Sequence, residues 1–271
     1  MSKYKAIALD IDGTLINSKK EITPRVLQKI QKLQEKGVAV IIASGRPPHG
    51  IAHVAKALGM DRNGGYVSAF NGGKIIEFQT GEVKYQATVP EELRDEIIRY
   101  AHTIPESTIL LHGDGVIYTE DDTNEYARFE SDIVRMPLKK VEDLHEVIDY
   151  PANKYLITGN PELMPEYSKK MAKHFEGRLN IMQSAPFFIE VIPPGVDKAE
   201  SLAKLIAMLG IKREELVACG DGENDLGMIR YAGLGVAMEN GEDCVKEAAD
   251  FVTTSCENDG VANVIEKFME D

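Results

Sequence analysis

The chain has 271 residues, 43% hydrophobic and 28% charged, which suits one large or two ordinary globular domains with a buried core. Its 31 Lys and Arg against 44 Asp and Glu give a formal net charge of −13, which argues against nucleic acid or an anionic membrane as partner. The three cysteines lack CxxC spacing and are expected to be reduced thiols of a cytoplasmic protein. No signal peptide is recognised, and no apolar run approaches the roughly 20 residues of a membrane helix.

The first third of the chain alternates short apolar runs with amphipathic patterns, as is typical of a parallel α/β sheet. The apolar runs predict strands at Ala6–Leu9, Val38–Ala43 and Tyr66–Phe70. Thr23 and Pro24 are typical of a helix start, and Gly37 of its end. A further apolar stripe from Ile51 to Leu58 predicts a second helix.

The pattern changes near residue 75, where pairs of short runs predict antiparallel hairpins. The two hairpins are expected at Lys74–Phe78 with Val83–Ala87, and at Ile109–Leu111 with Val116–Tyr118. Helices are expected at Glu91–Ala101 and Pro161–Phe175, and a further strand at Phe187–Ile192. This middle third is therefore expected to be an antiparallel sheet with helices.

The first pattern returns from Asp197 onward. Strands are expected at Leu216–Cys219, Leu234–Met238 and Phe251–Thr253, and helices around Leu202, Leu226, Val245 and Val261. The sequence thus predicts an α/β fold in which a parallel-sheet core, residues 1–82 and 191–271, is interrupted by an α+β domain over residues 83–190.

Four polar clusters follow predicted strands of the core. They are Asp10–Leu15 (DIDGTL), Ser44–Arg46 (SGR), Asn71–Gly73 (NGG) and Gly220–Asp225 (GDGEND). Lys198 lies at the start of the helix that begins the last third. In an open parallel sheet, ligands bind at the carboxyl ends of the strands, so we expect these groups to gather at one edge.

The carboxylates in these clusters indicate a metal. Asp221 and Asp225 add two acids to the pair Asp10 and Asp12, and no histidine lies near them in sequence. Oxygen-only ligands suit a hard ion, Mg²⁺ rather than Zn²⁺.

The remaining groups indicate phosphate chemistry. Ser44 and the amide of Gly45, near a helix start, are suited to a phosphate oxygen, and Lys198 can supply the cation that a dianion needs. A carboxylate that attacks phosphorus forms an acyl phosphate that water can cleave. A second acid two residues away can protonate the leaving oxygen and then deprotonate the attacking water.

A calcium-binding EF-hand is the main competing interpretation of the first cluster. Asp10, Asp12 and Glu21 fit the first, third and last positions of such a loop, but Leu15 stands where its glycine is required. The six histidines are dispersed without metal-ligand spacing, which favours surface or packing roles.

DIDGTL, ASGR, Lys198 and GDGEND, in this order, resemble the four motifs of the haloacid dehalogenase (HAD) phosphatase superfamily. Only 29 residues separate Thr14 from Ser44, whereas 151 separate Arg46 from Lys198. A large cap at that second place, with NGG and NDGVA (Asn258–Ala262), resembles the Cof-type branch. The run GDGENDLGMIRYAGLGVAMENG is similar to the YidA-type sugar phosphatases of that branch. The resemblance implies a Rossmann-like core with an inserted α+β cap.

The resemblance also implies an activity, a Mg²⁺-dependent phosphatase acting on small phosphorylated metabolites, with sugar phosphates expected. Asp10 would be the nucleophile and Asp12 the general acid/base. Asp10, the backbone carbonyl of Asp12 and Asp221 would hold Mg²⁺, with Asp225 and Asn224 supporting them.

The same resemblance assigns substrate-binding residues. The phosphoryl group would be bound by Ser44, Gly45, Lys198, Asn224 and the amide of Ile11. Arg46, Asn71 and Gly72 are candidates for the rest of the substrate, although Arg46 is equally well explained as a structural C-cap partner.

Two alternatives remain open on the sequence. A phosphomutase of the same superfamily would share the aspartyl-phosphate step. A non-enzymatic phosphosugar-binding regulator is disfavoured, because a binder needs no nucleophile. The expected partner is a small phosphorylated molecule, with no nucleic acid or membrane, bound by a cytoplasmic monomer or homodimer; the residues that select the substrate are expected in the cap.

Overall fold

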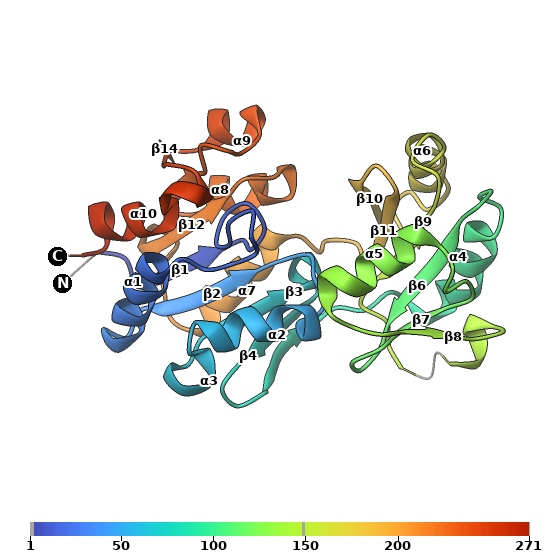
Figure 1. The fold of residues 1–271 in the computed structure, drawn as a ribbon, viewed down its shortest axis with the longest axis horizontal. Helices are drawn as coiled ribbons and strands as arrows, with labels where there is room; N and C mark the ends of the chain where they lie inside the picture. The colour runs from blue at the N-terminus through green and yellow to red at the C-terminus, as the bar shows by residue number, and fades with distance from the viewer. Residues whose placement is uncertain (1–2, 148–149, 271) are drawn as a thin grey trace. The chain divides into compact units, whose positions relative to one another are not determined.

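The computed structural model describes residues 3–147 and 150–270. The chain forms two compact units, each with its own sheet (Figure 1). The first unit contains the chain up to Gly45, Ile51–Tyr85 and the chain from Asp197. The second contains Arg46–Gly50 and Gln86–Val196. Among the described residues, none of the helices has the length and apolar character needed to cross a membrane.

The first unit is built on an eight-stranded sheet in the order β14-β13-β12-β1-β2-β3-β4-β5. The strands are β1 (Ala6–Leu9), β2 (Ala39–Ala43), β3 (Tyr66–Ala69), β4 (Lys74–Glu77), β5 (Val83–Gln86), β12 (Leu216–Gly220), β13 (Leu234–Ala237) and β14 (Phe251–Val252). Neighbours from β14 to β3 are parallel, and β4 runs antiparallel to β3. Because β1 pairs with both β12 and β2, strands from the two ends of the sequence adjoin at the centre.

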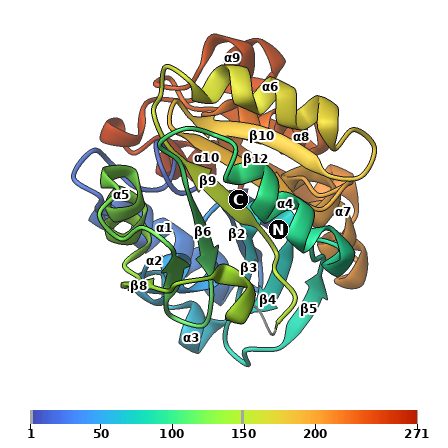
Figure 2. The same ribbon diagram turned by 90° about the vertical axis from the view of Figure 1, so that its right-hand side faces the viewer.

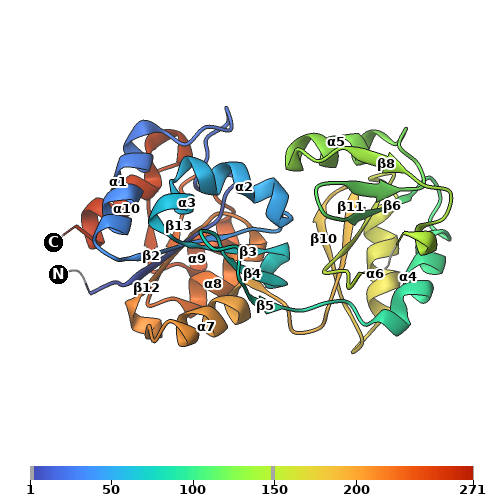
Figure 3. The same cartoon turned by 90° about the horizontal axis from the view of Figure 1, so that it is seen from below.

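Helices cover both faces of this sheet (Figure 3). One face carries α1 (Pro24–Glu35), α2 (Pro48–Ala57), α3 (Met60–Asn63) and α10 (Gly260–Phe268), and the other α7 (Lys198–Met208), α8 (Leu226–Tyr231) and α9 (Asp243–Ala248). Successive strand residues point to opposite faces, so Ile7 packs under the first set of helices and Ala8 under the second. A strand buried on both faces must be apolar throughout, which explains the run at Ala6–Leu9.

The first predicted hairpin forms, but as part of the first unit's sheet. After β3, the short helical turn Phe70–Gly72 reverses the chain, and β4 pairs back along β3 with Val67 opposite Ile76. Ile75 is fully buried in the first unit's core, and β5 continues the sheet beyond β4. The antiparallel pattern therefore begins inside the parallel sheet, because the tight turn after β3 leaves no room for a crossover helix.

The second unit is an α+β domain on a six-stranded sheet in the order β10-β11-β9-β6-β7-β8. Its strands are β6 (Thr108–His112), β7 (Ile117–Thr119), β8 (Leu138–Lys140), β9 (Tyr155–Thr158), β10 (Asn180–Ala185) and β11 (Phe188–Ile192). All pairs are antiparallel except β7 with β8. The predicted hairpin of β6 and β7 is confirmed.

Helices α4 (Arg94–Ala101) and α6 (Met164–His174) lie over one face of this second sheet (Figure 2), and α5 (Glu125–Val134) packs on the other. The sequence pattern predicted α4 and α6 but not α5, β8, β9 or β10. The predicted fold class, a parallel α/β core interrupted by an α+β insertion, is confirmed.

The two units have separate hydrophobic cores. Two clusters, one on each face of the larger sheet, consist of first-unit residues alone, and two others consist of second-unit residues alone. Phe175 is fully buried in the second unit, where its ring lies 5.9 Å from that of Tyr100. A substitution that disrupts the core of the second unit should therefore leave the core of the first unit intact.

Replacing Phe175 with alanine tests this separation. Truncation of a buried phenylalanine costs about 3–5 kcal/mol, through lost burial and the cavity left behind. We expect faster hydrogen exchange in β6, β9 and β11 and unchanged exchange in β1 and β12, measured by mass spectrometry. Phe129→Ala, at a side chain that is 47% exposed, is the matched control and should change little. Equal loss of protection in both sheets would contradict separate cores.

Candidate active site

The segment after β1 forms a closed loop. The amide of Asp10 donates to the carbonyl of Cys219 on β12 at 3.1 Å, which continues the sheet by one residue. The carbonyl of Ile11 accepts from the amides of Leu15 and Ile16, both at 3.0 Å, while the Ile11 side chain is fully buried. The DIDGTL backbone is therefore fixed by the sheet on one side and by its own turn on the other.

Gly13 brings this loop against Asp221, which follows β12. Gly13 has a φ of 79°, and a Cβ there would lie 2.8 Å from the carboxyl carbon of Asp221. The Thr14 hydroxyl donates to Asp221 Oδ1 at 2.7 Å, and Asn240 Nδ2 donates to the Gly13 carbonyl at 2.8 Å. Only glycine permits both this backbone conformation and this close approach.

A buried ammonium group links two of the predicted acids. Lys198 is the first residue of α7, whose N-cap Asp197 accepts from the amide of Glu200 at 2.7 Å. Lys198 Nζ lies 2.6 Å from Asp10 Oδ1 and 2.6 Å from Asp225 Oδ1, and the Lys198 side chain is 1% exposed. Burial lowers the pKa of Lys198, but the two carboxylates more than offset this and the net pKa is raised.

Three carboxylates surround a space that suits a cation. One oxygen each of Asp10, Asp221 and Asp225 lie within 4.8 Å of one another. Burial raises the pKa of Asp10 to about 7 although Lys198 opposes it, and burial raises the pKa of Asp221 to about 6. One ammonium cannot balance three ionised carboxylates. An oxygen-only donor set with excess negative charge fits a hard divalent ion.

Asp225 differs from the other two acids because protein donors already occupy both of its oxygens. Its Oδ2 accepts from the amides of Asp221, at 2.9 Å, and Gly222, at 3.1 Å, and its Oδ1 accepts from Lys198. The side chain is 1% exposed. This carboxylate therefore shapes the Asp221 loop and orients Lys198, whereas Asp10 and Asp221 have more coordination capacity left.

Four other predicted substrate-binding residues follow β2, β3 and β12. The Ser44 carbonyl accepts from the amide of Asn71 at 3.0 Å, and Asn71 Oδ1 accepts from Asn224 Nδ2 at 3.2 Å. A Cβ on Gly45 would lie 3.1 Å from Asn71 Oδ1, so the Gly45 backbone packs tightly against the Asn71 side chain. The neighbouring order of β12, β1, β2 and β3 places the carboxyl ends that carry these groups side by side.

Three predicted site residues make further contacts. Gly72, with a φ of 102°, packs against the Asp197 carbonyl and Ser201 at the start of α7. Arg46 belongs to the second unit, and its guanidinium donates to the Ile133 carbonyl at 3.4 Å. The Asp12 carboxylate is 43% exposed and pairs with Lys20.

Sequence reasoning did not identify Thr14, Asn240 or Lys20 as site residues. Thr14 and Asn240 lie inside quoted motifs, so the signal that they matter was present, but their partners in the fold are 207 and 227 positions away. Lys20 lies outside all of these motifs, so the sequence gives no indication of a role for it.

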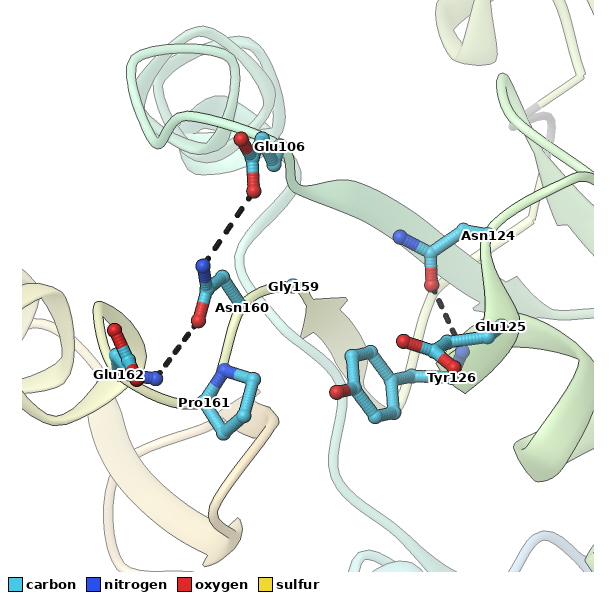
Figure 4. A pocket seen from close by; sticks show the side chains of 8 residues that line it. All are labelled: Glu106, Asn124, Glu125, Tyr126, Gly159, Asn160, Pro161 and Glu162. Carbon is cyan, nitrogen blue, oxygen red and sulfur yellow. Dashed lines mark hydrogen bonds between the residues drawn. The ribbon is translucent and has the colours of Figure 1, made fainter.

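A groove in the second unit is a further concave site (Figure 4). It has a volume of about 470 Å³. Its lining residues are Glu106, Asn124, Glu125, Tyr126, Gly159, Asn160, Pro161 and Glu162. None of them is cationic, and Asn160 is engaged by hydrogen bonds with Glu106 and the Glu162 amide. Such a groove repels a phosphate.

Replacing Gly13 with alanine tests the close approach to Asp221, since the new methyl group would displace that carboxylate. We expect added Mg²⁺ to raise the melting temperature of the natural protein but not that of Gly13→Ala, measured by thermal unfolding with and without the ion. Gly37→Ala is the matched control: Gly37 has a φ of 77° but nothing lies within 4 Å of its Cβ position. Both variants should lose about 1–2 kcal/mol to left-handed strain, but only Gly13→Ala should lose the metal response. An unchanged response in Gly13→Ala would contradict the role of this contact.

Comparison with known proteins places this site in a family. The sequence profile of the haloacid dehalogenase-like hydrolases matches residues 7–265. A Bacillus subtilis chain named 5-amino-6-(5-phospho-D-ribitylamino)uracil phosphatase is 30% identical over 272 residues, covering 99% of this chain and 98% of its own.

Solved structures agree in fold over nearly the whole chain. A haloacid dehalogenase-like hydrolase from Bacteroides thetaiotaomicron has a TM-score of 0.93 at 39% identity, covering 97% of this chain and 99% of that one. A structure described as a sugar phosphatase of HAD subclass IIB has a TM-score of 0.80 at 25% identity, covering 97% and 98%. The predicted resemblance is confirmed: the chain belongs to the haloacid dehalogenase-like hydrolases, in their Cof-type branch.

Proposed function

We propose that this chain is a Mg²⁺-dependent phosphatase that hydrolyses small phosphorylated metabolites through an aspartyl-phosphate intermediate. The observation that carries the proposal is the buried Lys198 ammonium, held at 2.6 Å from both Asp10 and Asp225 beside Asp221. A carboxylate nucleophile can approach a phosphate dianion only if nearby positive charge offsets their repulsion. The family assignment supports a hydrolytic reaction.

The metal completes this charge balance. Asp10, the backbone carbonyl of Asp12 and Asp221 are proposed as its ligands, with Asp225 and Asn224 in support. Bound Mg²⁺ would supply the positive charge that the two remaining carboxylates and the transferring phosphoryl group require. The choice of Mg²⁺ rests on the oxygen-only donor set.

The chain's own residues then perform two displacements at phosphorus. In the first, a carboxylate oxygen of Asp10 bonds to phosphorus, the ester P–O bond breaks, and Asp12 gives its proton to the leaving oxygen. In the second, Asp12 takes a proton from water, the water oxygen bonds to phosphorus, and the bond to Asp10 breaks to release phosphate. Lys198 offsets negative charge on Asp10 in both steps.

Polar groups after β1, β2 and β12 and at the start of α7 are proposed to hold the phosphoryl oxygens. These are the Ser44 hydroxyl, the amides of Gly45 and Ile11, and the Asn224 side chain, together with Lys198. Arg46, Asn71 and Gly72 are proposed for the rest of the substrate. The hydrogen bond between Asn224 and Asn71 supports a shared role for this edge.

The proposed substrate is a sugar phosphate or a related phosphorylated polyol. The Bacillus subtilis relative is named for a phosphoribitylamino compound, and a structural relative is described as a sugar phosphatase. Both names describe a phosphate on a hydroxyl-bearing carbon chain. Residues 1–82 and 191–271 would form the catalytic core, and residues 83–190 a cap that selects the leaving group. A cytoplasmic location is proposed because all three cysteines are free thiols.

Replacing Asp10 with asparagine tests the nucleophile. The amide cannot form the acyl phosphate, so we expect phosphate release from p-nitrophenyl phosphate to fall by about 10³ or more, with an unchanged circular dichroism spectrum. Asp61→Asn, at an aspartate in α3, is the control and should retain activity. Turnover retained in Asp10→Asn would refute the assignment. Separating free phosphate from isomerised hexose phosphate in the same assay would distinguish a phosphatase from a phosphomutase.

Replacing Asp221 with asparagine tests the metal site through stability. The substitution removes one of three mutually repelling carboxylates, so at pH 8 without metal the variant should melt at a higher temperature than the natural protein. With Mg²⁺ in hundredfold excess over its dissociation constant, the natural protein should gain about 2.7 kcal/mol and the variant much less. Calorimetry with and without EDTA measures both expected differences: the higher melting temperature of the variant without metal, and its smaller stabilisation by Mg²⁺. If Mg²⁺ stabilised Asp221→Asn as much as the natural protein, this result would contradict the assignment of Asp221 as a metal ligand.

A further inference from the structure

Lys20 contacts the side chain that the proposed mechanism uses as general acid/base. Its Nζ lies 2.9 Å from Asp12 Oδ1, and the two side chains are 61% and 43% exposed. Asp12 is thus far less enclosed than Asp10. Its charge nevertheless reaches the site, since Asp12 contributes to the raised pKa of Asp221.

The loop that carries Lys20 is tightly built. Asn17 Oδ1 accepts from the amides of Lys19 and Glu21, both at 3.0 Å. The Asn17 amide donates to the Glu21 carbonyl at 3.0 Å, and the Lys20 amide donates to the Asn17 carbonyl at 2.9 Å. These bonds fix Lys20 in the left-handed region, with a φ of 61°. Residues with a side chain adopt this conformation at a cost in free energy.

The loop is also attached at both of its sides. Ile16 forms a β-bridge with Asp12, which ties the start of the loop to the DIDGTL segment. The Ser18 amide donates to Glu257 Oε1 at 2.6 Å, which ties its tip to the last third of the chain. Lys20 therefore extends from a fixed backbone, on a loop that is tied to the DIDGTL segment carrying Asp12.

We propose that Lys20 is a positioning residue for Asp12 in the phosphatase reaction, an inference that rests on the proposed function. Stability alone does not explain the arrangement, because an exposed ion pair contributes little and the left-handed backbone costs free energy. A general acid must lie within hydrogen-bond reach of the leaving oxygen, and an ion pair reduces the number of conformers open to a carboxylate. Lys20 thus limits the conformers of the Asp12 side chain.

The dependence of rate on the leaving group separates positioning of Asp12 from a general loss of activity. An alkyl phosphate such as glucose 6-phosphate needs a proton on its leaving oxygen, while p-nitrophenolate leaves without one. Hydrolysis of the aspartyl phosphate needs Asp12 with either ester, so the comparison is made on the first displacement, as release of the leaving group in a single turnover. In that step Asp12→Asn should slow the alkyl ester far more than the aryl ester. Lys20→Met should show the same selectivity at smaller size, with the single-turnover rate about tenfold lower on the alkyl ester, a part of the 10²–10⁴-fold that acid–base catalysis contributes, and little change on the aryl ester.

Three further variants make this test specific. Lys19→Met is the matched control, because Lys19 is an exposed lysine of the same loop, and it should behave as the natural protein. Lys20→Arg keeps the positive charge and should restore most of the rate on the alkyl ester. Lys20→Gly relieves the left-handed backbone and removes the amine, so it should raise the melting temperature yet show the same kinetic defect as Lys20→Met. A merely structural role predicts no such separation of stability from rate.

The double variant Asp12→Asn with Lys20→Met decides how Lys20 acts. If Lys20 works through Asp12, its removal should cause no further loss once Asp12 is replaced. An equal loss on both ester classes, or a further loss in the double variant, would overturn the proposal and indicate direct contact of Lys20 with the substrate. If Lys20→Met behaved as the natural protein while Asp10→Asn was inactive and Asp12→Asn was slowed on the alkyl ester as expected, this inference alone would be refuted. Turnover retained in Asp10→Asn would instead refute the proposed function.

Discussion

The interaction on which the site depends is the pair of contacts from the Lys198 ammonium to Asp10 and Asp225. Buried charges are costly unless they are paired and hydrogen-bonded. Here one cation from the start of α7 joins a carboxylate after β1 to another after β12, strands that are neighbours in the sheet. Because the acids still outnumber the ammonium, the fold creates a place that is complete only with further positive charge. That surplus of negative charge is the physical basis for a metal.

The division into two hydrophobic cores has a functional consequence. The charged cluster lies wholly in the first unit, on strand ends fixed by a sheet that is buried on both faces. The second unit, inserted between β5 and α7, packs around its own side chains. Side chains of the insertion can therefore change without disturbing the packing around the carboxylates. This separation is compatible with the proposed role of the insertion in selecting the substrate.

Three residues in or beside the candidate site have a left-handed backbone. Gly13, Asn71 and Lys20 all have positive φ values, and each makes a contact with a predicted site residue. Gly13 admits the Asp221 carboxylate, Asn71 receives the Asn224 amide, and Lys20 reaches Asp12. Strained residues persist only where the surroundings over-determine them, and functional sites are the usual place. Here the strain serves to bring side chains from distant parts of the sequence together.

The sequence by itself determined the family and most of the core. Apolar runs followed directly by acids or small polar residues are local patterns, so strands β1, β2, β3 and β12 and the groups after them were predictable. Only the tertiary structure decided which groups meet. Thr14 finds Asp221 207 positions away, β4 and β5 join the parallel sheet, and α5 forms where the sequence pattern gave no helix. The reason is that such contacts depend on strand order and burial, which arise from the whole fold and leave no mark on a short stretch of sequence.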